Sequence, residues 1–373
     1  MKSGATGLDP TMYLRQLAIE RSVADHPYAR QIARRAALPV RIVDETELAT
    51  LVDGDYPDNL QAGKRTLLLC RNPGSFLKPC PSTREYRCCR YQVINIGTGC
   101  PMDCVYCILQ AYLNTPYLTF FVNTDDLLTE LAATCARIDR PVLRIGTGEF
   151  TDSMALDRIT GLSRKLIRFF AGQKRVVLEL KSKAAYVENL ADLDHNGGTI
   201  MAWSLNSPAI GAGEELRTAS LGERLRAAAR CAAWGYPLAF HFDPIIAHRD
   251  WQQGYRQVID DLFATVPASA IRWISLGAFR FIPKLKQIGT GRFPRSAIYH
   301  HEFVPGLDTK QRYFRTLRVE MYREIYDRLR RHCDPRTCIY FCMESDEIWR
   351  AVMGFCPADR GGLPAMLDRT VDR

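Results

Sequence analysis

The feature that most constrains the fold is an alternation of short apolar runs with helical stretches between residues 91 and 277. Such alternation is typical of βαβ units, in which helices connect parallel strands. Six or so units predict an α/β fold with a partial (β/α)6-type barrel, whose functional residues collect at the carboxyl ends of the strands. The predicted strands are Val93–Ile96, Leu118–Val122, Val142–Ile145, Val176–Leu180, Thr199–Ser204, Leu238–Phe242 and Ile271–Leu276. The predicted helices are Thr124–Ile138, Ala155–Phe170, Ala184–Leu193, Leu216–Trp234 and Trp251–Phe263.

The flanking segments follow other patterns, so we expect three domains, 1–90, 91–277 and 278–373. The N-terminal segment is expected to be helical, around Tyr13–Ala24 and Ala29–Ala37, and then irregular over residues 70–90, which are rich in Pro, Cys and Arg. The C-terminal segment is expected to be a basic α+β extension. Its predicted elements are the helix Gln311–Arg331, the strand Ile339–Met343 and the helix Asp346–Met353.

The chain is expected to be cytoplasmic. It has no run of 18 apolar residues that could span a membrane, and Met1–Gly7 lacks the apolar core of a signal peptide. Its 13 cysteines are an odd number. In a reducing compartment, clustered cysteines indicate metal or redox sites rather than disulfides.

The sharpest motif is Cys100-Pro-Met-Asp-Cys104-Val-Tyr-Cys107, which directly follows a predicted strand and Gly97-Thr98-Gly99. Three thiolates on one short loop can bind three irons of a [4Fe–4S] cluster. Because such clusters normally take four cysteines, the fourth iron is left open for another ligand. Zinc is the alternative metal, but zinc sites usually pair cysteines as C-x2-4-C with a second pair further on, and no such partner pair exists here.

This spacing, with an aromatic residue before the third cysteine, resembles the radical S-adenosylmethionine superfamily. The resemblance implies that the cluster on Cys100, Cys104 and Cys107 binds S-adenosylmethionine. Reductive cleavage then yields a 5′-deoxyadenosyl radical, which abstracts a substrate hydrogen, and an electron donor such as flavodoxin or ferredoxin is implied as a partner. The segment Arg144-Ile-Gly146-Thr147-Gly148-Glu149 resembles the superfamily's Gly-Gly-Glu motif. The resemblance implies that Gly146, Thr147, Gly148 and Glu149 bind the cofactor.

Further stretches, over roughly residues 90–260, resemble the spore photoproduct lyases, which repair a thymine dimer in DNA. They are Cys104–Gln110, Phe121–Asn123, Ser182-Lys183, Trp203–Asn206, Glu223–Ala228, Gly235–Phe240, Pro244–His248 and Trp251–Tyr255. By this resemblance Lys183 binds the cofactor's carboxylate, Ser204 contacts its polar groups and Tyr106 lines the active site. The implied activity is a lyase-type reaction on a DNA lesion or other nucleic acid.

Two positions depart from that family. The cysteine that returns a hydrogen to the product corresponds to Phe150, which has no thiol to donate one. The tyrosine that follows the last cluster cysteine corresponds to Ile108. Cys135 is close in sequence to the donor position but falls in a predicted helix. We therefore expect a relative of the lyases that has the cofactor chemistry without the usual quenching residues.

Residues Arg280–Arg331 contain 13 Lys/Arg and 5 Asp/Glu, a net charge of +8 out of +9 for the chain. Cations interleaved with aromatic residues are suited to nucleic acid. A solvated charged helix is the alternative, because acidic residues are interleaved on the predicted helix. The aromatic residues are Phe279, Phe281, Phe293, Tyr299, Tyr313 and Phe314.

Other polar residues stay open in function. Cys80, Cys88 and Cys89, or the set Cys333, Cys338, Cys342 and Cys356, are candidates for a second metal site or for buried packing. His241 and Asp243 end a predicted strand and are candidates for the barrel mouth. Two rival functions also remain: a radical enzyme acting on a peptide or small molecule, and a non-enzymatic iron–sulfur sensor that binds DNA.

Overall fold

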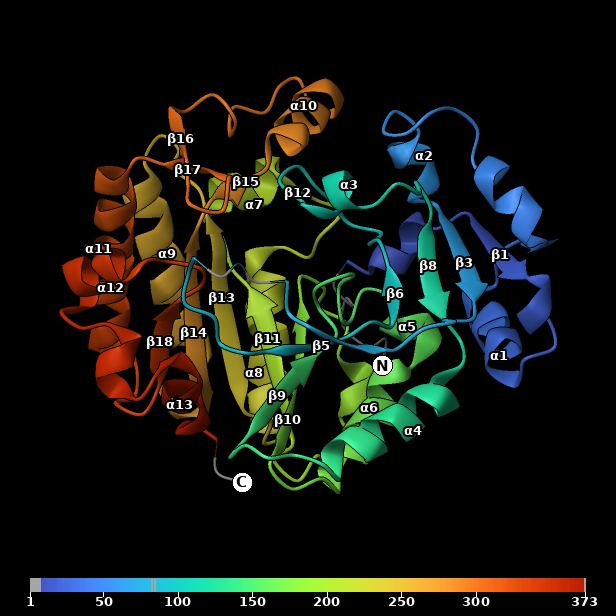
Figure 1. Cartoon of the computed structure of the whole chain (residues 1–373), viewed down its shortest axis with the longest axis horizontal. Helices are drawn as coiled ribbons and strands as arrows, with labels where there is room; N and C mark the ends of the chain where they lie inside the picture. The colour runs from blue at the N-terminus through green and yellow to red at the C-terminus, as the bar shows by residue number, and fades with distance from the viewer. Residues whose placement is uncertain (1–7, 82, 84, 372–373) are drawn as a thin grey trace, which may run out of the picture.

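The computed structural model describes residues 8–81, 83 and 85–371. Its centre is an eight-stranded sheet that curls into a half-barrel, in the order β18-β14-β13-β11-β10-β9-β5-β4 (Figure 1). Every neighbouring pair is parallel except β4 with β5. The strands are β4 (Leu77–Pro79), β5 (Gln92–Ile94), β9 (Leu143–Gly146), β10 (Val176–Ser182), β11 (Thr199–Ser204), β13 (Leu238–Ile245), β14 (Ile271–Ala278) and β18 (Cys338–Phe341). The predicted partial barrel is confirmed.

The helices of the half-barrel pack on the outside of the sheet. The helix α6 packs on β10 and β11, α8 on β11 and β13, and α11 on β14, while α9 contacts both α8 and α11. Every residue of β11 is buried, as expected for a parallel strand in the middle of a sheet. The helices of this layer are α4 (Thr124–Cys135), α5 (Asp157–Thr160), α6 (Leu162–Ala171), α8 (Leu221–Ala233), α9 (Trp251–Thr265) and α11 (Arg315–His332).

The N-terminal segment is not mainly helical, which corrects the expectation for residues 1–90. It supplies three strands to a second sheet, in the order β2-β1-β3-β8-β6. The expected helix Tyr13–Ala24 is wrong, because Leu17, Ala18 and Ile19 form a strand in which all three side chains are buried. A short apolar run of this kind has no periodicity that separates strand from helix. The strands are β1 (Gln16–Glu20), β2 (Val40–Val43), β3 (Thr66–Cys70), β6 (Gly97–Thr98) and β8 (Leu118–Phe121).

Other expected elements shift. The strand β8 pairs with β3 and β6 rather than joining the barrel. Residues 184–193 hold only the 3₁₀ turn η4 (Glu188–Leu190) in place of the expected helix. The helix α8 begins after Ser220, whose hydroxyl accepts from the Glu223 N–H in a capping box, so residues 216–220 stay outside it. Likewise, Gln311–Tyr313 is a strand and α11 begins at Arg315.

The remaining elements are short. The strands are β7 (Asp103–Cys104), β12 (Glu215–Leu216), β15 (Arg280–Phe281), β16 (Phe303–Pro305) and β17 (Gln311–Tyr313). The helices are α1 (Pro27–Ala36), α2 (Leu60–Gly63), α3 (Leu109–Tyr112), α7 (Pro208–Gly213), α10 (Pro283–Arg292), α12 (Asp346–Met353) and α13 (Leu363–Asp368). The other 3₁₀ turns are η1 (Pro10–Tyr13), η2 (Arg21–Val23), η3 (Glu45–Thr50), η5 (Ala268–Ala270) and η6 (Pro357–Arg360).

Residues 85–91, which we call the strap, contact the segment after the edge strand β18 and lead into β5, which is next to the opposite edge strand β4. At one end the strap runs into β5. At the other, the Arg87 N–H donates to the Glu344 carbonyl at 3.4 Å, and the Arg87 guanidinium pairs with Asp346, Nε to Oδ1 at 2.7 Å. Residues from the N-terminal and C-terminal segments therefore border the same space inside the half-barrel. Within the described ranges, no helix has the length and apolar character to cross a membrane.

Candidate active site

The three motif cysteines lie on the loop between β6 and α3, and all three line a cavity of about 380 Å³ inside the half-barrel. The loop is fixed by its backbone, because Cys104 pairs with Glu215 in the β7–β12 ladder and the Val105 N–H donates to the Glu214 carbonyl at 2.9 Å. Asp103, between the cysteines, is buried and bonded to two cations. The Lys64 ammonium is 3.0 Å and the Arg292 guanidinium 3.0 Å from its carboxylate oxygens.

Three cysteines around one cavity are compatible with an iron–sulfur cluster. In the described part of the chain, no three His, Cys, Asp or Glu side chains converge on one ion position. A [4Fe–4S] cluster instead takes each cysteine on a different iron, so its ligands need to surround a common space rather than meet at a point. Burial raises the pKa of Cys104 to about 12 despite the nearby Lys183 ammonium. Iron binding would replace that proton, since the thiolate is the ligand.

The Tyr106 ring forms one wall of this cavity and is held from behind. Its hydroxyl donates to Glu215, whose other carboxylate oxygen is 2.6 Å from Nη2 of Arg224. Both ion-pair side chains are almost fully buried, with 1% of Glu215 and 3% of Arg224 exposed. The Lys183 ammonium lies 5.7 Å from the centre of the Tyr106 ring. Burial, followed by the Glu215 charge, raises the pKa of Tyr106 well above its usual value.

The residues expected to bind the cofactor divide into two groups. Gly148, Glu149, Lys183 and Ser204 line the cavity. The Glu149 carboxylate is 2.7 Å from the Lys181 ammonium, so the two charges are held together at the cavity wall. The Lys183 N–H donates to Asp152 at 2.8 Å, which fixes the backbone at the end of β10.

Gly146 and Thr147 lie behind the cavity rather than in its lining. The Gly146 Cα faces Tyr91 and the backbone of Glu179, and a Cβ there would lie 1.8 Å from the Tyr91 hydroxyl oxygen. The Thr147 hydroxyl donates to Ser153 at 2.8 Å. Both residues thus support the packing of β9 against its neighbours.

Three buried side chains in the cavity form a hydrogen-bonded network, and the sequence analysis identified only His241 among them. His241 Nε2 is 2.7 Å from Glu179 Oε1, and Nδ1 is 2.6 Å from the Ser275 hydroxyl. All three residues line the cavity. Burial alone would raise the pKa of Glu179, but the His241 charge and hydrogen bond and the Lys181 charge lower it to about 2. The sequence signal for this network was a polar residue within an otherwise apolar strand, as Glu179 is in β10 and His241 in β13. Alternate positions of a strand share one face, so such residues can meet inside the barrel.

The four C-terminal cysteines considered as a second metal site do not come together in the structure. Cys338 and Cys342 are at opposite ends of β18, and Cys333 and Cys356 do not line the cavity. Cys342 instead shares the cavity with Cys80, Cys88 and Cys89. Asp243, expected at the mouth, also lines the cavity, where Oδ1 is 3.1 Å from Nη1 of Arg280.

Much of the basic segment Arg280–Arg331 is paired within the molecule. In addition to Arg280 and Arg292, Arg318 bonds Glu344 at 2.7 Å and Arg328 bonds Asp260 at 2.5 Å. The expectation that its aromatic residues are available for stacking is wrong for most of them. Phe279, Phe281, Tyr299 and Tyr313 are buried against one another, whereas Phe314 is 46% exposed.

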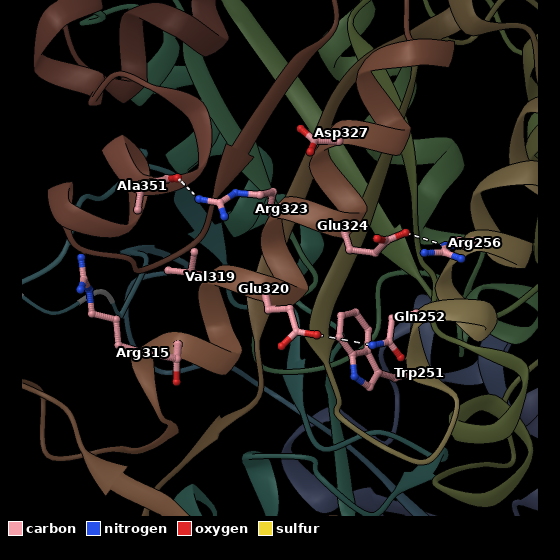
Figure 2. A pocket seen from close by; sticks show the side chains of 11 residues that line it. Trp251, Gln252, Arg256, Arg315, Val319, Glu320, Arg323, Glu324, Asp327 and Ala351 are labelled. Carbon is pink, nitrogen blue, oxygen red and sulfur yellow. Dashed lines mark hydrogen bonds and ion pairs between the residues drawn. The ribbon is translucent and has the colours of Figure 1, made fainter.

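A second, more open cavity has a volume of about 580 Å³. Figure 2 shows the side chains that line it, which come from α9, α11 and Ala351 of α12. Two of its arginines are bonded within the molecule: Arg256 Nε is 2.6 Å from Glu324, and Arg323 donates to the Ala351 backbone carbonyl at 2.6 Å. No residue of the cysteine loop borders it. This second cavity is therefore separate from the one that the cysteine loop lines.

A half-barrel of parallel strands whose carboxyl ends face a loop of three cysteines defines a radical S-adenosylmethionine enzyme. Within that class, the family model described as spore photoproduct lyase matches residues 19–330. The chain belongs to the spore photoproduct lyase family and is a lyase-type enzyme of the radical S-adenosylmethionine class.

Individual relatives agree with this assignment. The spore photoproduct lyase of Bacillus subtilis (strain 168) is 27% identical over 242 residues, 64% of this chain and 69% of the relative. That of Geobacillus sp. (strain Y412MC61) is 29% identical over 208 residues, 55% of this chain and 61% of the relative. A solved structure of a spore photoproduct lyase double mutant with bound AdoMet and dinucleoside spore photoproduct matches with a TM-score of 0.77 at 22% identity. It covers 88% of this chain and 99% of its own. That likeness confirms the fold.

Proposed function

We propose that this enzyme binds a [4Fe–4S] cluster on Cys100, Cys104 and Cys107, cleaves S-adenosylmethionine reductively and acts on a lesion in DNA. The observation that carries the proposal is that the three cysteines open onto the same cavity as Glu149, Lys183 and Ser204. When bound, the cluster and S-adenosylmethionine supply a carbon-centred radical that removes a hydrogen atom from the substrate.

The chain's own residues would bind and orient the cofactor. The Glu149 carboxylate suits the amino group of S-adenosylmethionine, and the Lys183 ammonium suits its carboxylate, since opposite charges make the stronger hydrogen bonds. Ser204 offers a hydroxyl to the polar groups of the cofactor. The absence of a side chain at Gly148 leaves room for the cofactor beside Lys181. Tyr106, held by Glu215, keeps one wall of the cavity apolar and excludes water from it.

The substrate is inferred from the relatives. Solved spore photoproduct lyases bind dinucleoside spore photoproduct, and a cavity of about 380 Å³ is within the range that takes a ligand of this size. A lesion base in duplex DNA would have to leave the stack to enter it. Phosphate contacts require accessible cations. In the basic segment Arg280–Arg331, the side chains of Lys284, Lys286 and Arg295 are exposed and could make such contacts.

We further propose that the parts have different roles: residues 91–277 carry the cofactor chemistry, 278–373 contact nucleic acid and 1–90 support the cluster loop through Lys64. Electrons for the cluster would come from a low-potential donor such as flavodoxin or ferredoxin.

The test of the substrate uses anaerobically reconstituted, dithionite-reduced protein with dinucleoside spore photoproduct, undamaged dinucleoside or neither. Loss of the lesion, with S-adenosylmethionine cleavage stimulated by it, supports the proposal. Cleavage that neither lesion nor irradiated DNA stimulates, with no lesion lost, would contradict it and favour a peptide or small-molecule substrate. An intact cluster with no cleavage at all would favour a DNA-binding sensor.

A further inference from the structure

Four thiols outside the cluster loop line the cavity, and the proposed cofactor binding uses none of them: Cys80, Cys88, Cys89 and Cys342. Cys80 follows β4 and Cys342 follows β18, so these two come from opposite edges of the curled sheet. Cys88 and Cys89 lie on the strap between the edges. Buried cysteines are usually small apolar residues. These four instead border a polar space that also contains the Glu149–Lys181 and Asp243–Arg280 ion pairs.

Radical chemistry in this cavity needs a source of hydrogen atoms. Removing a hydrogen atom from a closed-shell substrate leaves an odd electron. A lyase-type reaction involves no net oxidation of the substrate, so a hydrogen atom must be returned to give a closed-shell product. The S–H bond of a thiol is weaker than the C–H bond it would form, so transfer from a thiol to a carbon radical is downhill. Phe150 cannot serve, because it has no such bond and does not line the cavity.

We propose that Cys342 is the hydrogen-atom donor of this enzyme. The inference rests on the proposed function, since it assigns the residue that completes the reaction at the same site. In the step, the Cys342 S–H bond breaks homolytically and a C–H bond forms at the substrate carbon radical, leaving a thiyl radical on Cys342. One electron and one proton then restore the thiol, the electron coming from the same class of low-potential donor that reduces the cluster.

The position of Cys342 favours it over the other three thiols. It follows the carboxyl end of a barrel strand, where functional residues collect, and its N–H donates to the Leu276 carbonyl at 2.9 Å, which fixes its backbone. Arg280, itself paired with Asp243, donates from Nη2 to the Cys342 sulfur at 3.6 Å. That contact orients the sulfur and leaves its hydrogen available for transfer.

The competing thiols have other constraints. The Cys88 sulfur accepts from the Arg90 N–H at 3.2 Å, within the strap. A hydrogen bond with Cys88, together with burial, raises the pKa of Cys89, so these two adjacent thiols interact with each other. Cys80 follows β4, which runs antiparallel to β5, so it does not lie at the carboxyl end of a parallel strand. A donor must also keep its hydrogen at neutral pH, and burial raises the pKa of Cys342 to about 12.

The experiment follows deuterium from solvent into the repaired product. Thiol hydrogens exchange with D₂O, so wild-type enzyme acting on dinucleoside spore photoproduct in D₂O should give product with one deuterium. Cys342→Ala should still consume the lesion, but its yield of deuterated product should fall about tenfold or more. Cys80→Ala is the competitor variant. Cys338→Ala is the matched control, because Cys338 lies on the same strand and does not line the cavity; both should label like wild type.

A second readout needs no cofactor. In cluster-free wild-type protein, dinucleoside spore photoproduct at ten times its Kd should slow alkylation of Cys342 by iodoacetamide about tenfold, with no effect on Cys338. Unchanged labelling in Cys342→Ala, loss of labelling in Cys80→Ala instead, or alkylation of Cys342 unaffected by the dinucleoside would overturn the assignment. Wild-type enzyme that leaves the lesion intact would overturn the proposed function, and the inference with it. That outcome is distinguishable because it precedes any comparison of variants.

Discussion

The Lys183 ammonium lies 5.7 Å from the centre of the Tyr106 ring, which places a positive charge beside the tyrosine between the second and third motif cysteines. The two residues come from different elements: Tyr106 from the cysteine loop and Lys183 from the end of β10. A cation over an aromatic face is stabilised by the ring quadrupole. This pair therefore holds a positive charge next to the space where a cluster and the carboxylate of S-adenosylmethionine would sit.

Replacing that charge should weaken cofactor binding. We expect Lys183→Met to raise the Kd of the reconstituted enzyme for S-adenosylmethionine by about 10- to 100-fold, because a hydrogen bond to a charged group contributes about 1.5–3 kcal/mol. Equilibrium dialysis with labelled cofactor measures this. Lys286→Met removes an exposed lysine and should leave the Kd unchanged. Equal Kd values for wild type and Lys183→Met would refute the assigned role.

The buried pair behind Tyr106 should matter for stability. Arg224→Met leaves the Glu215 carboxylate buried without its cation, so we expect the free energy of unfolding to fall by about 3–5 kcal/mol. Urea denaturation followed by circular dichroism measures the change. The exposed pair Arg230–Glu188, with Nη1 2.8 Å from Oε1, provides the comparison. Arg230→Met should cost at most about 1 kcal/mol, and similar losses in the two variants would contradict the account.

Glu179 should make stability depend on pH. The pKa of Glu179 in the folded protein, about 2, is below its usual value of 4.5, so its contribution to stability is present above pH 4.5 and is lost as the pH falls toward 2. The shift corresponds to about 3 kcal/mol at neutral pH. Glu179→Gln should therefore be less stable than wild type at pH 7, and the difference should shrink between pH 4.5 and pH 2. A difference that stays constant over this window would show that the charge of Glu179 is not what stabilises the fold.

DNA binding should depend on the exposed cations of the basic segment. We expect the triple variant Lys284→Ala, Lys286→Ala, Arg295→Ala to reduce the slope of log K against log salt concentration by about 2–3, since each phosphate contact contributes about 0.9. Fluorescence anisotropy with irradiated duplex DNA measures the slope. Arg328→Ala removes a cation already bonded to Asp260 and should leave the slope nearly unchanged. The reverse pattern would place the interface elsewhere.

The sequence was sufficient for the half-barrel and for the cysteine loop, because both depend on local patterns. The strand–helix alternation predicted β9, β10, β11, β13 and β14, and the spacing of Cys100, Cys104 and Cys107 predicted a single metal-binding loop. Glu149, Lys183 and Ser204 were found through the family resemblance, and the structure brings all three to the cavity.

Long-range pairing could not be predicted in the same way. The strand β8 has the sequence of a barrel strand, and only its hydrogen bonds to β3 and β6 assign it to the second sheet. Cys80 and Cys342 are 262 positions apart in the chain and share a cavity because the sheet curls until its edges approach. The aromatic residues near Arg280 suggested a surface for stacking with bases. In the structure they pack against one another instead, with Phe279 in contact with Phe281, Tyr299 and Tyr313.

The most direct test of the central claim is the amount of 5′-deoxyadenosine formed from S-adenosylmethionine by the reconstituted, dithionite-reduced enzyme. Cys104→Ala and Cys231→Ala form the matched pair, since Cys231 is buried in α8, outside the cavity. We predict that wild type and Cys231→Ala form 5′-deoxyadenosine and that Cys104→Ala forms none. Equal formation in Cys104→Ala, or none from wild-type protein whose iron–sulfur absorbance is intact, would contradict the assignment of a radical enzyme to this cysteine loop.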